Sequence, residues 1–229
     1  MTVEAVIFDW GGTLTPWHDI ELAGMWRRIC TAHLGPDEVE RAAAALADAE
    51  LELWRRGTHE HRSATLAEVY TLAGVEATEA ILATHYEAWT PHTFIDPAAP
   101  PLLAALRERG IKVGVLSNTM WTRDWHERIF ARDGVLDLLD GAVYSSEIPW
   151  TKPHAGAFRA AMDAVGATDP GACVFVGDRP YDDIHGAQST GMRAVLVPNS
   201  TVPVHDGTVP DATIGALGDL LSHIDTWSR

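Results

Sequence analysis

The chain has 229 residues, 46% of them hydrophobic, so it can bury one sizeable core and a smaller second domain. A formal net charge of −15 without any basic run argues against a cationic surface, and we expect no nucleic-acid partner. Two distant cysteines indicate no disulfide framework, and no apolar stretch resembles a leader or a membrane span, so we expect a soluble, cytoplasmic protein without membrane contact.

The first predicted element is a strand that ends in an acid. Residues 6–8 form an unbroken apolar run, which is typical of a strand buried on both faces of a parallel sheet. Asp9 follows directly, at the strand end where open α/β sheets bind ligands. Gly11 and Gly12 would let the backbone turn tightly and approach a bulky anion, although an Asp in this place can also simply cap a turn.

Four helices are predicted next, with no strand between them. Their apolar residues recur at helical spacing in the segments 19–33, 36–56, 63–73 and 78–89. We expect Gly35, Gly57 and Gly74 to separate these helices. The segment 90–101, which contains four prolines, is predicted to be a hinge. The pattern therefore indicates a helical bundle inserted after the first strand.

From residue 102 onward, predicted strands and helices alternate. The strands are expected at 111–116, 142–144, 173–176 and 194–197, and the helices at 102–109, 122–132, 154–165 and 183–190. A loop at 200–208 precedes a last strand end and helix within 214–224. This alternation predicts an α/β fold, a Rossmann-like doubly wound parallel sheet covered by helices.

Three of the predicted strands end in polar residues. Asp9 follows the first strand, Ser117 and Asn118 follow the second, and Asp178 follows the strand at 173–176. The carboxyl ends of parallel strands lie along one edge of a sheet, so these side chains can converge in one crevice. Lys152, one of only two lysines, stands just before a predicted helix and could join them. The sequence thus predicts a functional site at this edge.

These segments resemble, in their order and spacing, the haloacid dehalogenase (HAD) superfamily of hydrolases, which are chiefly phosphatases. Asp9 matches the nucleophile motif, Ser117 the second motif, Lys152 the third, and residues 177–183 (GDRPYDD) the fourth. The helical insert resembles the mobile cap of many members. The resemblance therefore implies a core of residues 1–15 and 96–229 and a helical cap of residues 16–95.

The resemblance also implies a role for each matched residue. Asp9 would attack a phosphate ester and carry an aspartyl-phosphate, while Lys152 holds Asp9 ionised and offsets phosphoryl charge. The implied cofactor is Mg²⁺, with ligands from Asp9, the backbone carbonyl of Gly11 and Asp178. Asp183 would orient Lys152 or metal-bound water from a second shell. The residues expected to bind the phosphoryl group are Gly12, Ser117, Asn118 and Thr119. The expected partner is a small phosphorylated metabolite, and the chain is expected to be a monomer or homodimer.

The sequence departs from the family pattern at Gly11, where most phosphatases of this kind have a second aspartate. That aspartate acts as general acid and base, which typically contributes ~10²–10⁴-fold in rate. Three explanations stay open: a substrate with a good leaving group, such as a sugar 1-phosphate or acyl phosphate; another acid; or a ligand-binding protein with residual turnover. The candidates for another acid are His18, Asp19, His59 and His61.

Two related chemistries can be compared with the sequence. Phosphonoacetaldehyde hydrolases need a cap lysine, and no lysine lies between Thr15 and Pro101, so we reject that reaction. Haloacid dehalogenases attack carbon without a metal and usually lack an intact fourth motif, whereas Asp178 and Asp183 preserve it here. Gly11 keeps metal-independent dehalogenation open as an alternative. The main prediction is Mg²⁺-dependent hydrolysis of small phosphate monoesters.

Several tryptophans flank the motifs. We expect Trp10, Trp121, Trp125 and Trp150 to pack in the core or between domains, with pocket lining as the alternative. Trp26, Trp54 and Trp89 are expected in the core of the insert. Asp182 is expected to be a solvated acid at a helix start.

Overall fold

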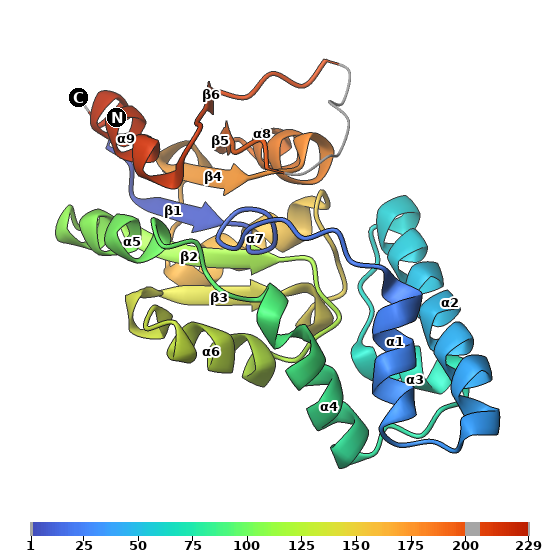
Figure 1. The fold of residues 1–229 in the computed structure, drawn as a ribbon. Coiled ribbons are helices and arrows are strands. Elements are labelled where there is room, and N and C mark those ends of the chain that lie inside the picture. The colour runs from blue at the N-terminus through green and yellow to red at the C-terminus, as the bar shows by residue number, and fades with distance from the viewer. Residues whose placement is uncertain (1, 200–206, 229) are drawn as a thin grey trace.

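Six parallel strands form one sheet in the computed structural model, which describes residues 2–199 and 207–228 (Figure 1). Their order across the sheet is β3-β2-β1-β4-β5-β6. The strands are β1 (Ala5–Phe8), β2 (Lys112–Ser117), β3 (Gly141–Tyr144), β4 (Cys173–Gly177), β5 (Arg193–Leu196) and β6 (Ala212–Thr213). The central strand β1 pairs with β2 on one side and β4 on the other, so the chain reverses its winding direction beside β1. This confirms the predicted doubly wound α/β fold.

Helices cover both faces of the sheet because side chains alternate along each strand. Val6 and Phe8 belong to a hydrophobic cluster with α5 (Ala99–Glu108), α6 (Arg123–Arg132) and α9 (Leu220–Trp227). Ile7 packs on the other face against α7 (Ala155–Val165) and α8 (Gly186–Ser189). All four residues of β1 are buried, which explains the unbroken apolar run in the sequence.

Four helices lie between β1 and β2 in the chain. They are α1 (Leu22–Thr31), α2 (Pro36–Glu60), α3 (Leu66–Ala73) and α4 (Glu79–Trp89). They enclose a hydrophobic cluster of their own that includes Trp26, Leu46 and Tyr70. Figure 1 shows this insert beside the ends toward which the arrows of β1 and β2 point. The exact division into a core of 1–15 and 96–229 and a cap of 16–95 stays a prediction.

The helix ends differ from the sequence prediction where capping or turn chemistry decides them. The first helix begins at Leu22 rather than residue 19, because the Glu21 side chain accepts hydrogen bonds from the amides of residues 23 and 24. Gly57 does not end α2, which continues to Glu60 and stops at His61 in a left-handed conformation. Two of the four hinge prolines occupy the first turn of α5, where a missing amide hydrogen costs nothing.

Further differences fall in the last third of the chain. The helix expected at 183–190 is a π-helical turn, Pro180–His185, followed by α8. The strand end expected near residue 214 is β6, which lies two residues earlier. Of the expected loop at 200–208, residues 200–206 lie outside the described part of the chain.

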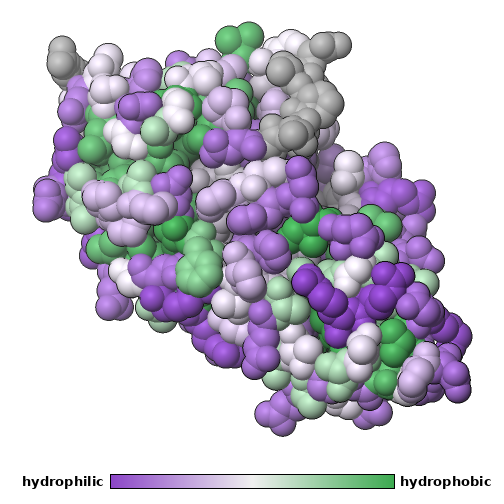
Figure 2. Space-filling model, viewed as in Figure 1, coloured by the Kyte–Doolittle hydropathy of each residue, from purple (hydrophilic) through white to green (hydrophobic). Residues whose placement is uncertain are grey.

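The surface of the insert is mostly polar on the face seen in Figure 2, with a few hydrophobic residues between charged ones. This matches the amphipathic pattern of its helices, which bury one face and expose the other. Among the described residues, no helix is both long and apolar enough to span a membrane.

Candidate active site

Asp9 lies at the carboxyl edge of the sheet, immediately after the central strand. Its backbone amide donates to the carbonyl of Val176 on β4 at 2.8 Å, which fixes the residue between the ends of β2 and β4. Its side chain is almost completely buried. Because the winding direction reverses here, the two neighbouring strand ends leave a crevice of the kind in which open α/β sheets bind ligands.

Lys152 joins two buried carboxylates at this edge. Its Nζ atom lies 2.6 Å from Asp9 Oδ1 and 2.7 Å from Asp183 Oδ1, and the residue is only 3% exposed. Burial alone would lower the pKa of Lys152, but the carboxylates of Asp183 and Asp9 together raise it above its usual value. The lysine is therefore held as a cation. Burial raises the pKa of Asp183, an effect that Lys152 opposes.

Asn118 positions Lys152 through its side-chain amide. Its Oδ1 accepts from the backbone amide of Lys152 at 2.8 Å, and its Nδ2 donates to the backbone carbonyl of the same residue at 3.1 Å. Ser117 ends β2 and is buried beside this clamp. The second motif thus holds the third motif in place, a function of the Asn118 side chain that the sequence analysis missed.

Thr119 has a different environment from the one expected. Its backbone amide donates to Ser145 Oγ at 2.8 Å, and Ser145 Oγ donates back to the Thr119 carbonyl at 2.9 Å. Its Oγ1 accepts from the amide of Trp121 and contacts His126 Nε2 at 3.1 Å. Thr119 lines the cavity. Its backbone amide already donates to Ser145, which directly follows β3.

Three buried carboxylates could hold a metal ion. One oxygen from each of Asp9, Asp178 and Asp183 lies within 4.8 Å of the others. Such a set of oxygen ligands suits a hard divalent cation such as Mg²⁺. Glycines next to these carboxylates leave the space that the carboxylates occupy. A Cβ on Gly12, which has φ +85°, would lie 2.5 Å from Asp178 Oδ2, and a Cβ on Gly177 would collide with the Asp183 carboxylate.

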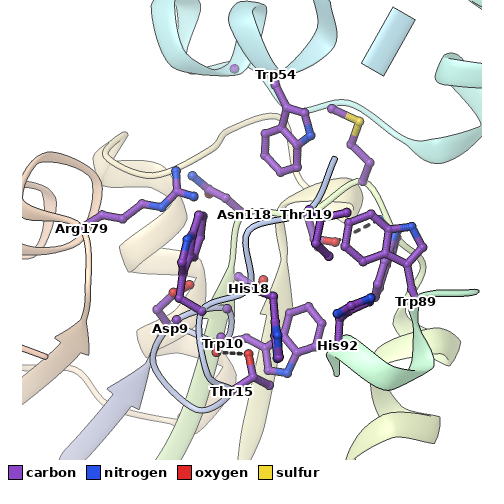
Figure 3. A pocket seen from close by; sticks show the side chains of 18 of the residues that line it. Asp9, Trp10, Thr15, His18, Trp54, Trp89, His92, Asn118, Thr119 and Arg179 are labelled. Atoms are coloured by element: carbon purple, nitrogen blue, oxygen red, sulfur yellow. Dashed lines mark hydrogen bonds between the residues drawn. The ribbon is translucent and has the colours of Figure 1, made fainter. Parts of the chain in front are cut away.

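A cavity of about 850 Å³ opens above these residues, between the sheet edge and the insert (Figure 3). Asp9 and Lys152 line it on the side of the sheet edge, together with Ser117 and Asn118. Residues of α2, including Trp54, and the segment around His92 form its other walls. This volume is within the usual range for small-molecule sites and exceeds what a phosphate group alone would fill.

Two of the four candidates for a replacement acid line the cavity. His18 and Asp19 line it, whereas His59 and His61 are not among the described residues that do. The ring of His18 lies 5.1 Å from that of His92, which the sequence analysis did not consider (Figure 3). At Gly11 an added Cβ would have no heavy atom within 4 Å, so an acid is missing there without any steric reason.

The sequence model of the haloacid dehalogenase-like hydrolases matches residues 3–191, which include every residue of this site. The chain belongs to this family. A protein named as a phosphatase in Mycobacterium tuberculosis is 30% identical over 96% of this chain and 98% of its own length. The resemblance inferred from the motifs is therefore confirmed, and the chain is a HAD-like hydrolase.

Solved structures of the same fold include phosphatases and dehalogenases. A HAD phosphatase from Thermococcus onnurineus superimposes with a TM-score of 0.70 at 22% identity, covering 96% of this chain and 97% of the other. A 2-haloacid dehalogenase from Pseudomonas syringae superimposes with a TM-score of 0.68 at 25% identity, covering 99% of this chain and 100% of the other. Backbone similarity therefore does not separate the two chemistries within the family.

Arg179 is a cavity-lining cation of this hydrolase that the sequence analysis overlooked. It follows Asp178 directly, and that place in the fourth motif was the available signal. Its guanidinium lies 5.5 Å from the ring of Trp17, and burial, which would lower its pKa, is outweighed by nearby acids led by Asp182. Asp182 lies in the first turn of the helical segment Pro180–His185, as predicted, but its side chain is only 21% exposed and lines the cavity.

The tryptophans divide differently from the expectation. Trp26 is buried in the insert core, as predicted. Trp54 instead lines the cavity and is 37% exposed, because it faces the sheet edge from α2 rather than the neighbouring helices (Figure 3). Trp10 and Trp121 both pack against the hydrophobic cluster of the sheet and line the cavity, so their two suggested roles coexist.

Proposed function

We propose that this hydrolase is a Mg²⁺-dependent phosphatase that cleaves small phosphate monoesters through a covalent aspartyl-phosphate on Asp9. The observation that carries the proposal is the Lys152 cation, paired with Asp9 and Asp183 within a group of buried carboxylates at the sheet edge. A cation and several carboxylates meet in one crevice, which suits a reaction in which a carboxylate attacks an anionic group. The phosphatase named among its full-length relatives supports the same reaction.

In the first step, an Asp9 carboxylate oxygen attacks phosphorus while the bond from phosphorus to the ester oxygen breaks. Lys152 pairs with Asp9 and would offset charge on the transferred group. The Ser117 hydroxyl, the backbone amide of Asn118 and the backbone near Gly12 line the same side of the cavity and would donate to phosphoryl oxygens. Thr119 is assigned a supporting role, since its amide already donates to Ser145.

Mg²⁺ would be held by Asp9, Asp178 and the backbone carbonyl of Gly11, and it would supply further neutralisation of phosphoryl charge. Asp183 is assigned to the second shell because both of its oxygens have protein partners. Oδ1 pairs with Lys152 at 2.7 Å, and Oδ2 accepts from the Arg179 amide at 2.9 Å. It therefore orients Lys152 and the loop of the fourth motif.

In the second step, water attacks the aspartyl-phosphate, the bond between phosphorus and the Asp9 oxygen breaks, and inorganic phosphate leaves. No acid stands at Gly11 to protonate the departing ester oxygen in the first step or to activate this water. Substrates with good leaving groups need such an acid least. We infer that residues 16–95 act as a cap that closes over the cavity, which would exclude bulk water during transfer.

The test is release of inorganic phosphate from a panel of sugar 1-phosphates, acyl phosphates and alkyl phosphates, with Mg²⁺ and with a chelator. We expect metal-dependent release, fastest on good leaving groups, and loss of turnover in Asp9→Asn. Asp163→Asn, on the exposed side of α7, is the matched control and should keep the wild-type rate. Equal rates with and without Mg²⁺, or an active Asp9→Asn variant, would refute the proposal.

The second candidate is metal-independent dehalogenation, favoured by the absence of an acid at Gly11 and by a dehalogenase of the same fold. In that reaction Asp9 would attack carbon and displace halide. Chloride release from a 2-chloro acid in the presence of a chelator would support it. A preserved fold with no turnover of either substrate class would instead favour a ligand-binding protein.

A further inference from the structure

The basic residues of the cavity are unevenly distributed. The described lining residues include two cations, Lys152 and Arg179, and both lie on the side of the sheet edge, beside the acids Asp9 and Asp182. On the side of the insert, the described lining residues include no lysine or arginine but do include acids, namely Asp19, Glu21 and Glu50. A ligand whose phosphoryl group lies at the sheet edge would therefore place its other end in a negative environment.

Glu50 is the acid that lies deepest on the insert side. Its Oε2 accepts from Trp26 Nε1 at 2.8 Å and its Oε1 from Trp54 Nε1 at 3.3 Å. Within the described chain, no basic side chain lies within ion-pair distance of it. Burial raises the pKa of Glu50, an effect that the two indole donors oppose. Buried acids in proteins are usually paired with a cation, and this one faces a cavity instead.

Aromatic rings line the cavity that Glu50 faces. Trp54 lies one helical turn beyond it on α2, and its exposed face forms part of the cavity wall (Figure 3). A second series of rings leads from the sheet edge toward the insert: Trp10 and Trp121 are 5.7 Å apart, and Trp121 and Trp89 are 5.4 Å apart. Aromatic faces beside a carboxylate favour an organic cation over a hydrated metal ion.

The position of Glu50 along α2 sets the size of the ligand. The Gly57 carbonyl accepts from Thr151 Oγ1 at 3.1 Å, so this end of α2 touches the segment that carries Lys152. Glu50 precedes Gly57 by seven residues, which places it roughly 10 Å farther along the helix axis. A ligand that reaches both Asp9 and Glu50 therefore needs a spacer longer than a few atoms.

We propose that the substrate carries an ammonium group, which binds Glu50 beside Trp54 while the phosphoryl group binds at Asp9. This inference rests on the proposed phosphatase function and adds the chemical class of its substrate. Glu50 is then a specificity residue, with no part in bond cleavage. The indole donors of Trp26 and Trp54 hold its carboxylate in place at the cavity wall, as preorganised recognition sites require.

The experiment compares ω-aminoalkyl phosphates with n-alkyl phosphates of equal chain length, from two to eight carbons. The two members of a pair differ in the ammonium group and share the leaving oxygen. We expect wild-type kcat/KM to favour the amine by about tenfold or more at the longer chain lengths, because only these span the cavity. Glu50→Gln keeps a carbonyl acceptor but removes the charge, so the ratio within each pair should fall close to one.

The matched control is Glu52→Gln, on the same helix, where the native glutamate is exposed and pairs with Arg55. It should keep the wild-type amine preference. Equal kcat/KM values within every pair, or an unchanged preference in Glu50→Gln, would overturn the inference while leaving the phosphatase proposal intact. No metal-dependent release from any pair, nor from the sugar 1-phosphates and acyl phosphates of the panel above, would instead overturn the phosphatase proposal. If Glu50→Gln does not fold, the wild-type ratios alone decide.

Discussion

Asn118 holds Lys152 by both of its backbone polar groups, with hydrogen bonds of 2.8 Å to the amide and 3.1 Å to the carbonyl. The two residues are 34 positions apart, and this contact connects the end of β2 to the segment before α7. It fixes the backbone of Lys152, from which the side chain reaches Asp9. The phosphoryl-transfer geometry that we propose therefore depends on an amide that touches no reacting atom.

Asn118→Leu tests this positioning role. We expect kcat to fall about 10–100-fold with a smaller change in KM, because a misplaced Lys152 stabilises the transition state less. Steady-state phosphate release measures both parameters. A purely structural role would lower stability but leave kcat and KM of the folded fraction unchanged.

Lys152→Met removes the cation shared by Asp9 and Asp183. Two buried carboxylates then face each other unpaired, which typically costs about 3–5 kcal/mol when one partner of a buried ion pair is lost. We expect no detectable turnover and a lower free energy of unfolding in urea. Lys112→Met, at an exposed end of β2, is the control and should affect both quantities little. Wild-type turnover in Lys152→Met would contradict the role that we propose for Lys152 in this site.

The adjacent glycines should respond differently to the same substitution. Gly12→Ala puts a Cβ 2.5 Å from Asp178 Oδ2 at a positive φ, so we expect loss of activity and destabilisation of about 1–3 kcal/mol. Gly11→Ala meets open space and should fold normally. Urea unfolding and Mg²⁺ titration of activity compare the two variants. Similar behaviour of both would show that Asp178 does not constrain the loop.

Gly11→Asp restores the acid that most phosphatases of this family have. Since nothing lies within 4 Å of the added Cβ, the variant should fold, and its rate on alkyl phosphates should rise by about 10²-fold or more. Rates on acyl phosphates should rise less, because their leaving groups need no proton and only the attack of water in the second step benefits. Unaltered rates on alkyl phosphates would mean that another residue, such as His18 or Asp19, already supplies the proton.

His85 links stability to pH. Burial in the insert lowers its pKa from 6.5 to about 3, so below pH 6.5 the unfolded chain binds a proton that the folded chain does not. Stability should therefore fall as pH decreases, by about 2 kcal/mol from this residue between pH 7 and pH 5. His85→Phe should reduce the wild-type difference in unfolding free energy between these pH values by that amount. His59→Gln, on the exposed surface of α2, should leave the difference unchanged.

Much of the site could be predicted from sequence because several of its residues directly follow apolar runs that are recognisable as strands. An apolar run ending in Asp9, and a second ending in Asp178, fix two residues at the same sheet edge once the strands are parallel. The helix boundaries at Leu22 and Glu60 were harder to predict. They depend on a side-chain cap at Glu21 and on a left-handed residue, His61, that only the folded backbone reveals.

The sequence by itself determined the doubly wound sheet and the set of polar strand ends, because hydrophobic periodicity and the alternation of strands and helices can be recognised along the chain. Only the tertiary structure decided which side chains support the site and what surrounds it. The clamp of Asn118 on Lys152, the cavity face of Trp54 and the hydrogen bond from Trp26 to Glu50 each depend on segments brought together from distant parts of the chain. Such contacts follow from packing, which no local pattern specifies.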